Sequence, residues 1–166
     1  DVIKQICEEQ AQGEVVTPVN YNSPGQVVIA GHASAVSRAG EALKEAGAKR
    51  VLPLPVSVPS HCALMKPAAE KLKQELESIT VKSPVIDVIN NVDVMVETDP
   101  VAIKDALVRQ LYCPVRWTES VEKAADMSVE KAFEVGPGKV LTGLNKRITK
   151  SFNCSALNTA EALNSI

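Results

Sequence analysis

The sequence predicts an α/β protein, in which helices alternate with short apolar strands. Two patterns support this prediction. Apolar residues recur at intervals of three and four in several segments, which is typical of the buried face of a helix. Between these segments lie short apolar runs bounded by glycine, proline or asparagine, which is typical of strands. The chain has 166 residues, of which 45% are hydrophobic and 23% are charged, so it is long enough to bury a sizeable core.

The first predicted unit comprises residues 1–57 and has the order helix, strand, strand, helix, strand. Its first helix presents Ile3, Ile6 and Cys7 on one face. Gly13 ends this helix, because glycine tolerates a positive φ. A turn-forming Asn-Ser-Pro-Gly cluster makes the first two strands a hairpin. The elements predicted after the first helix are strands 15–21 and 26–30, a helix at 34–47 and a strand at 50–54.

This order matches a ferredoxin-like motif that lacks its first strand. An unpaired position in a sheet is costly and favours aggregation, so we expect the missing strand to precede Asp1. The chain also begins without a methionine. Both observations predict that the sequence is part of a longer protein.

The second predicted unit comprises residues 58–166, and the boundary lies near Pro55 and Pro59. Helices alternating with short apolar strands predict a parallel or mixed sheet that is covered on both faces. The predicted elements are a helix at 64–79, a strand at 85–89, helices at 101–112 and 118–125, and a strand at 132–135, followed by a glycine-containing loop at 136–140 and a basic helix end at 146–147.

Composition argues against several classes of protein. The formal net charge is −2, whereas a nucleic-acid-binding surface needs a basic excess. No apolar run reaches the length of about 18 residues that a membrane helix needs. The cysteines at 7, 62, 113 and 154 are scattered without a Cys-x-x-Cys spacing. This spacing predicts free thiols in a reducing cytoplasm rather than disulfides or a zinc site.

His61 is the first candidate for chemistry. It lies between a proline-interrupted extended segment and a helix, a position at which α/β proteins place functional side chains. A neutral imidazole can take a proton from a hydroxyl and return it to a leaving group. For that role, one ring nitrogen must face a nucleophile, and the other must be hydrogen-bonded to an acceptor that orients the ring.

The chain offers no convincing nucleophile for this histidine. Ser60 and Cys62 adjoin it, but neighbouring side chains of an extended chain point to opposite sides. No Gly-x-Ser-x-Gly elbow is present. His32 and Ser34 are better interpreted as the start of a helix, so we expect a structural role for His32.

The end of the helix at 101–112 offers an orienting acceptor. Gln110 shares a helical face with Ile103 and Leu107 and is expected to point inward, where its amide needs hydrogen-bond partners. Pro114 breaks the helix shortly afterwards. A helix end leaves carbonyls without partners, and one of these carbonyls could hold the N–H of the histidine. A satisfied core amide is the simpler alternative for Gln110.

Two further features remain open between binding and structural roles. Asn20 and Asn22 alternate along a strand, so both amides are predicted to face one side, where they would suit a polar ligand or a loop. The string GPGKVLTG at 136–143 resembles a phosphate-binding loop, but its glycine spacing does not fit and no Lys-Ser/Thr pair follows. A tight strand-to-helix turn explains it better.

Asn90-Asn91 is predicted to form a turn at a strand end.

Several long strings resemble one family. They are PVNYNSPGQVVIAGH, RVLPLPVSVPSHCALMKPAAEKL, INNVDV, IKDALVRQLYCPVRW and EVGPGKVLTGLNKRI, in that order. Together they resemble bacterial malonyl-CoA:acyl carrier protein transacylases, the malonyl-loading enzymes of type II fatty acid synthesis. The resemblance runs from end to end of this chain but covers only about the C-terminal half of the usual length of the family.

The resemblance implies roles for individual residues. His61 matches the catalytic histidine, and Gln110 matches the residue whose main-chain carbonyl orients it. Asn20 and Asn22 match amides that overhang the cleft from the small ferredoxin-like subdomain. Ser60 matches a small residue in a segment associated with acyl selectivity and is compatible with malonyl. The loop at 136–140, with Gly138 and Val140, matches a turn that borders the substrate cleft.

The resemblance also implies what is missing. The N-terminal half of the family carries a GQGSQ-type loop, a GHSLGE elbow with the nucleophilic serine, and an arginine that pairs with the malonyl carboxylate. None of these motifs occurs here. We therefore expect the C-terminal part of an α/β-hydrolase-like acyltransferase core plus a partial ferredoxin-like subdomain, in a cytoplasmic enzyme whose partners are malonyl-CoA, acyl carrier protein and its own N-terminal half. No metal or redox cofactor is implied, because the CoA thioester is the substrate and the phosphopantetheine belongs to the carrier. The isolated chain is expected to be inactive.

Two other classes remain as alternatives. One is a non-catalytic binding or interaction module that kept the fold without the serine-bearing half. The other is a nucleotide-binding α/β domain built on the glycine loop at 136–140.

Overall fold

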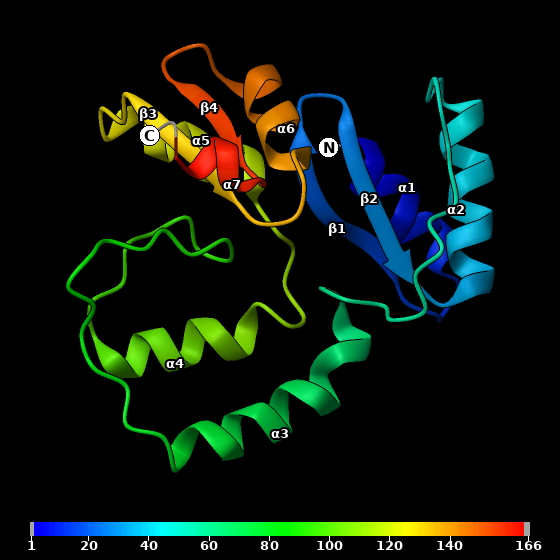
Figure 1. The fold of residues 1–166 in the computed structure, drawn as a ribbon. Coiled ribbons are helices and arrows are strands. Elements are labelled where there is room, and N and C mark those ends of the chain that lie inside the picture. The colour runs from blue at the N-terminus through cyan, green and yellow to red at the C-terminus, as the bar shows by residue number, and fades with distance from the viewer. Residues whose placement is uncertain (1, 165–166) are drawn as a thin grey trace.

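The computed structural model describes residues 2–164 and shows helices around two small sheets, each of two strands (Figure 1). The helices α1 and α2 pack beside the β1–β2 hairpin, α3 packs against α4, and α5, α6 and α7 lie around β3 and β4. The elements are α1 Val2–Ala11, β1 Val16–Ser23, β2 Gln26–Gly31, α2 Ala33–Glu45, a short 3₁₀ helix Ala63–Met65, α3 Lys66–Glu77, α4 Pro100–Arg109, α5 Trp117–Asp126, β3 Lys131–Val135, α6 Val140–Ile148, β4 Asn153–Leu157 and α7 Ala160–Leu163.

The predicted hairpin is confirmed. Strands β1 and β2 are antiparallel, and Ser23 pairs with Gln26 across a two-residue loop. Gly25 has a φ of 75°, which suits the glycine of a Pro-Gly turn. The hairpin, α1 and α2 enclose one core cluster, formed by Cys7, Val16, Ala35 and Ala39. Burial raises the pKa of the Cys7 thiol to about 11, so this cysteine acts as an apolar core residue.

Gly31 ends β2 where the backbone passes very close to β1. A Cβ atom at this position would lie 1.9 Å from the Val15 carbonyl oxygen, and the backbone on both sides is held by pairing. We expect Gly31→Ala to lower the free energy of unfolding by about 2 to 3 kcal/mol, measured by urea denaturation. Gly143→Ala, in α6 with no atom within 4 Å of the added Cβ, is the matched control and should be neutral or slightly stabilising. Equal stability of the two variants would contradict the steric argument.

Two predicted strands are wrong. Residues 50–54 and 85–89 form no strand, apart from one isolated bridge between Ile89 and Val96. A strand needs a neighbour for its backbone groups, and neither segment has a neighbouring strand among residues 2–164. Pro53 and Pro55 also remove two donors. Both segments leave large apolar side chains exposed, including Leu52 at 63% and Val85 at 99%.

The helices predicted in the second unit are confirmed, although their bounds differ by a few residues. Strand β3 is also confirmed, and its parallel pairing agrees with the predicted parallel or mixed sheet. Its partner, β4, was not predicted. The segment Asn153–Leu157 contains no β-branched residue, so it carried little strand signal. The expectation of a buried strand is wrong for β3, because Phe133 is 44% exposed and Val135 is 80% exposed. Within residues 2–164, the sheet formed by β3 and β4 is not covered on both faces.

Strand β1 joins the two predicted units. Its edge away from β2 pairs with the segment at Val115, through Tyr21 N–H to Val115 O at 2.9 Å and Val115 N–H to Val19 O at 2.8 Å. The Thr118 hydroxyl also donates to the Tyr21 carbonyl. This segment follows α4 directly, so the hairpin is tied to the end of α4. The domain boundary near Pro55 and Pro59 stays a prediction.

All four cysteines are free, which confirms the prediction of unpaired thiols. Among residues 2–164, none of the helices combines the length and the apolar character that crossing a membrane requires.

Candidate active site

His61 lies in a turn between the extended segment at 51–59 and the 3₁₀ helix that precedes α3. The expected position between an extended segment and a helix is confirmed. Its φ is 64°, a left-handed conformation that costs energy for a residue with a side chain. The backbone holds it there: His61 N–H donates to Leu111 O at 3.0 Å, and the buried Cys62 thiol donates to Pro59 O at 3.2 Å.

The His61 ring contacts the main chain at the end of α4. Its Nδ1 lies 2.7 Å from the carbonyl oxygen of Gln110, which is the contact that the helix-end argument and the resemblance both predicted. A carbonyl only accepts hydrogen bonds, so Nδ1 carries the proton. In the neutral ring Nε2 then has the free lone pair. The arrangement presents one basic nitrogen away from the acceptor that orients it.

Gln110 can provide this carbonyl because α4 ends immediately before it. The helix runs to Arg109, and Gln110 is its C-terminal cap residue. The next turns of the chain, stabilised by Tyr112 N–H and Cys113 N–H to Arg109 O, leave the Gln110 carbonyl without a helical donor. The open carbonyls expected at a helix end therefore supply both bonds to His61, from Gln110 and from Leu111.

No nucleophile accompanies this base within residues 2–164. No hydroxyl or thiol of that part of the chain is hydrogen-bonded to the His61 ring. Cys62 is 1% exposed and points its thiol at a carbonyl. The described residues therefore contain an oriented imidazole whose ring contacts no hydroxyl or thiol.

The other histidine has a structural position. Nδ1 of His32 accepts a hydrogen bond from Val15 N–H at 2.9 Å, which joins the start of α2 to the start of the hairpin. Ser34, in the first turn of α2, donates to the Glu14 carboxylate. The prediction of a structural role for His32 is confirmed.

Asn20 and Asn22 lie on β1, and both are half-buried. The pairing register with β2 shifts between Pro18 and Asn20 and again between Tyr21 and Ser23. Such bulges interrupt the simple alternation of side chains, on which the same-side prediction relied. Asn20 lies where β1 forms a bridge to Val115. Val115 comes five residues after Gln110 in the sequence. That the two amides act together stays a prediction.

The glycine loop at 136–140 leads from β3 into α6, and a carboxylate already occupies the helix start. Glu134 accepts hydrogen bonds from Leu141 N–H at 3.0 Å and Thr142 N–H at 2.7 Å. Partial burial raises the pKa of Glu134, but the bonds from Thr142 and Leu141 outweigh it and lower the pKa overall. Because these amides are the groups that a phosphate would need, the structure favours a capped strand-to-helix turn over a nucleotide site.

Arg109 carries an ion-pair cluster that the sequence analysis missed. Its guanidinium donates to both oxygens of Asp93, at 2.7 Å each, and to Asp105 at 2.5 Å. Asp105 is one turn earlier on α4, a spacing that signals a pair. Asp93 is 16 residues away in the loop that follows Asn90, and no local pattern in the sequence indicates this contact. The predicted turn at Asn90 is confirmed, since its Oδ1 accepts from Asp93 N–H.

The Asp93–Arg109 pair makes a testable contribution to stability. The hydrogen bonds from Arg109 lower the pKa of Asp93, because they favour the charged form. A lowered pKa stabilises the folded state above the ordinary pKa of an aspartate, and this stabilisation is lost as the pH falls through the folded pKa. We expect Asp93→Asn to lower the free energy of unfolding by about 1 kcal/mol at neutral pH. In urea denaturation at decreasing pH, the difference in free energy of unfolding between the wild type and Asp93→Asn should disappear in strong acid. A difference that does not change with pH would contradict this account.

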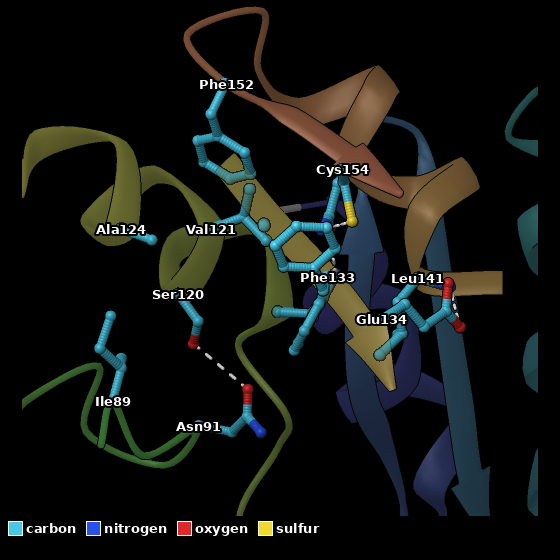
Figure 2. A pocket seen from close by; sticks show the side chains of 13 residues that line it. Ile89, Asn91, Ser120, Val121, Ala124, Phe133, Glu134, Leu141, Phe152 and Cys154 are labelled. Carbon is cyan, nitrogen blue, oxygen red and sulfur yellow. Dashed lines mark hydrogen bonds between the residues drawn. The ribbon is translucent and has the colours of Figure 1, made fainter. Parts of the chain in front are cut away.

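A hollow of about 250 Å³ lies between α5 and β3 (Figure 2). Its walls are mostly apolar, and the Ser120 hydroxyl donates to Asn91 Oδ1 at one side. None of the predicted site residues lines it. The lining residues are Ile89, Asn91, Trp117, Ser120, Val121, Ala124, Ala132, Phe133, Glu134, Leu141, Asn145, Phe152 and Cys154. The hollow is therefore an apolar surface beside a small sheet rather than part of the candidate site.

Comparison with known proteins identifies the family. The family model described as "Acyl transferase domain" matches residues 3–163. The chain belongs to the acyl transferase family. It is 67% identical over 161 residues to the malonyl CoA-acyl carrier protein transacylase of Salmonella typhimurium, and 43% identical over 164 residues to the protein of the same name from Bacillus subtilis. These alignments cover 97% and 98% of this chain but 52% of each relative, so this acyl transferase chain spans about half the length of the curated relatives it matches.

Solved structures confirm that the fold is the α/β fold of these acyl transferases. The acyl carrier protein S-malonyltransferase of Vibrio cholerae is 64% identical and superposes with a TM-score of 0.95, over 98% of this chain and 53% of the other. A malonyl-transacylase solved in complex with a type II polyketide synthase acyl carrier protein is 58% identical and superposes with a TM-score of 0.96, over 98% of this chain and 53% of the other.

Proposed function

We propose that this chain is the C-terminal part of a malonyl-CoA:acyl carrier protein transacylase, and that it supplies the general base of malonyl transfer. The observation that supports this proposal most strongly is the bond from His61 Nδ1–H to the Gln110 carbonyl, 2.7 Å long, in a chain 67% identical to a protein of that name. The carbonyl takes the place that a carboxylate has in a serine-histidine-aspartate triad.

The proposed reaction has two half-reactions of the same kind. A serine of the N-terminal half attacks the thioester carbonyl of malonyl-CoA while His61 Nε2 takes its proton. The C–S bond then breaks, His61 returns the proton to the departing CoA thiolate, and a malonyl-serine ester remains. In the second half-reaction the phosphopantetheine thiol of the carrier gives its proton to His61 and attacks the ester, and His61 returns the proton to the serine oxygen. The Gln110 carbonyl orients the ring and stabilises its protonated form.

We assign the remaining candidate residues to substrate contacts within this proposal. Asn20 and Asn22 would offer amides from β1, at the edge where the hairpin meets the segment after Gln110. Ser60, next to the base, is small enough to leave room for a malonyl group. Gly138 lies in the loop before α6, and Val140 is the first residue of α6, where it is 72% exposed and therefore free to meet a substrate.

The N-terminal half is proposed as the partner that completes the fold. Large apolar side chains are exposed in the two predicted strands that found no neighbour, as at Leu52 and Val85, and at the end of β3, as at Val135. Burying them would stabilise the protein by roughly 25 cal/mol for each Å² removed from water. In this proposal they become part of an α/β-hydrolase-like core, beside a ferredoxin-like subdomain, in a cytoplasmic enzyme that uses no metal or redox cofactor.

The test is malonyl transfer by the full-length protein, in which this chain is joined to its own N-terminal half. We expect malonyl-CoA and a phosphopantetheine-bearing carrier protein to give malonyl-carrier and free CoA, measured by mass spectrometry of the intact carrier. The same carrier without phosphopantetheine is the control and should gain no mass. If the protein binds malonyl-CoA but never transfers the malonyl group, a non-catalytic binding module becomes the better interpretation.

A further inference from the structure

We propose that the Asp93–Arg109 ion pair is a positioning device for the base: it fixes the end of α4 so that the Gln110 carbonyl stays against His61 Nδ1. The proposal rests on the proposed function and extends it to two residues that act through Gln110 rather than on the substrate.

The acceptor that orients His61 is a backbone atom, so its position depends on where α4 ends and how firmly that end is held. Arg109 is the last residue of α4 and precedes Gln110 directly. The Arg109 carbonyl also accepts from Tyr112 N–H and Cys113 N–H. A shift of Arg109 would therefore move the turn that presents the Gln110 and Leu111 carbonyls to His61.

Asp93 fixes Arg109 from outside the helix. Its two oxygens accept parallel bonds from Nη1 and Nη2 of Arg109 at 2.7 Å, a two-point contact that sets direction as well as distance. Asp105 also contacts Arg109, but it belongs to α4 itself. It moves with the helix and cannot fix the helix relative to the rest of the protein.

The loop that carries Asp93 also contacts the segment that follows this turn in the chain. Within the loop, the side-chain oxygen of Asn90 accepts a hydrogen bond from Asp93 N–H. The Asn91 carbonyl accepts from Arg116 N–H at 3.2 Å, and the Asn91 side chain accepts from Ser120 of α5. The loop thus contacts Arg109 before the turn and Arg116 after it. The segment whose carbonyls hold His61 lies between these two attachments.

Both members of the pair are partly shielded from solvent, with side-chain exposures of 30% for Arg109 and 25% for Asp93. The charges are complementary, and the Arg109 hydrogen bonds lower the pKa of Asp93, so the pair is ionised at neutral pH. A base displaced by about 1 Å can lose roughly a hundredfold in rate. A positioning contact of this kind therefore affects turnover more than substrate binding.

The experiment compares Asp93→Asn with Asp105→Asn in the full-length protein. Each variant removes one carboxylate partner of Arg109, but only the first frees the helix end from the loop. We expect Asp93→Asn to lower kcat about tenfold with little change in KM for malonyl-CoA. We expect Asp105→Asn to stay within about twofold of the wild type. Arg109→Lys keeps a charge but not the two-point contact, and it serves as a second variant with an intermediate expected loss of kcat if Asp93→Asn folds poorly.

A readout independent of activity is the tautomer of the His61 ring, from ¹⁵N chemical shifts of the labelled protein. The Gln110 contact requires the proton on Nδ1, so we expect the wild type and Asp105→Asn to show the Nδ1–H form, and Asp93→Asn to show a mixture. If Asp93→Asn and Asp105→Asn have the same kcat and the same ring tautomer, the positioning proposal is wrong. If the wild type transfers no malonyl group, the proposed function is wrong instead, and the tautomer comparison still decides the role of Asp93.

Discussion

His61→Ala in the full-length protein should abolish rapid malonyl transfer, with a loss in kcat of roughly a thousandfold or more. In the proposed mechanism the same ring takes the serine proton and returns it to CoA, so both half-reactions fail together. The variant should still bind malonyl-CoA, because the imidazole contributes mainly to the transition state. Stopped-flow detection of released CoA measures the first half-reaction directly.

The other histidine gives a matched control for this variant. His32 accepts a hydrogen bond from Val15 N–H, and the side-chain oxygen of asparagine can accept a similar bond. We expect His32→Asn to retain kcat within about twofold while costing about 1 kcal/mol of stability. If transfer by His61→Ala is close to the wild-type rate, or if His32→Asn loses as much activity, His61 is not the base.

The isolated 166-residue chain should show no malonyl transfer above the uncatalysed rate, and adding the separately produced N-terminal half should restore activity. The physical reason is that an oriented base without its nucleophile gives little catalysis. The exposed apolar residues at the two segments that failed to form strands, such as Leu52 and Val85, provide the surface on which the second half would assemble. The assay is transfer to carrier protein over a range of concentrations of the N-terminal half.

The control for this experiment mixes the N-terminal half with the 166-residue chain that carries His61→Ala. This mixture should stay inactive, since assembly alone does not supply the base. Substantial turnover by the 166-residue chain on its own would contradict the proposal, because a nucleophile would then have to lie within this sequence.

The features that the sequence predicted well are those with a local cause. Helix periodicity located α1, α2, α3, α4 and α5, and a Pro-Gly turn located the hairpin. The sequence offered the contact between His61 and the end of this helix as one of two alternatives for Gln110, because Pro114 ends a helix and a helix end leaves open carbonyls. What local pattern could not give is the left-handed φ of His61, which results from bonds to a segment 50 residues away.

The failures all involve contacts between distant segments. Residues 50–54 and 85–89 have strand-like composition, yet a strand exists only where a second segment accepts and donates its hydrogen bonds. Strand β4 shows the reverse case: Asn153–Leu157 has weak strand propensity, but pairing with β3 makes it a strand. The Asp93–Arg109 pair likewise depends on how the loop after Asn90 folds back onto α4.

The central claim is that this chain contributes the base and that the nucleophile lies outside it. The most direct measurement is the location of the covalent malonyl group. The full-length protein is treated with malonyl-CoA in the absence of carrier protein, quenched in acid, digested, and mapped by tandem mass spectrometry. The account predicts one malonyl ester, on a serine outside these 166 residues, and its loss in His61→Ala. A malonyl group found on a serine or cysteine within residues 1–166 would contradict it.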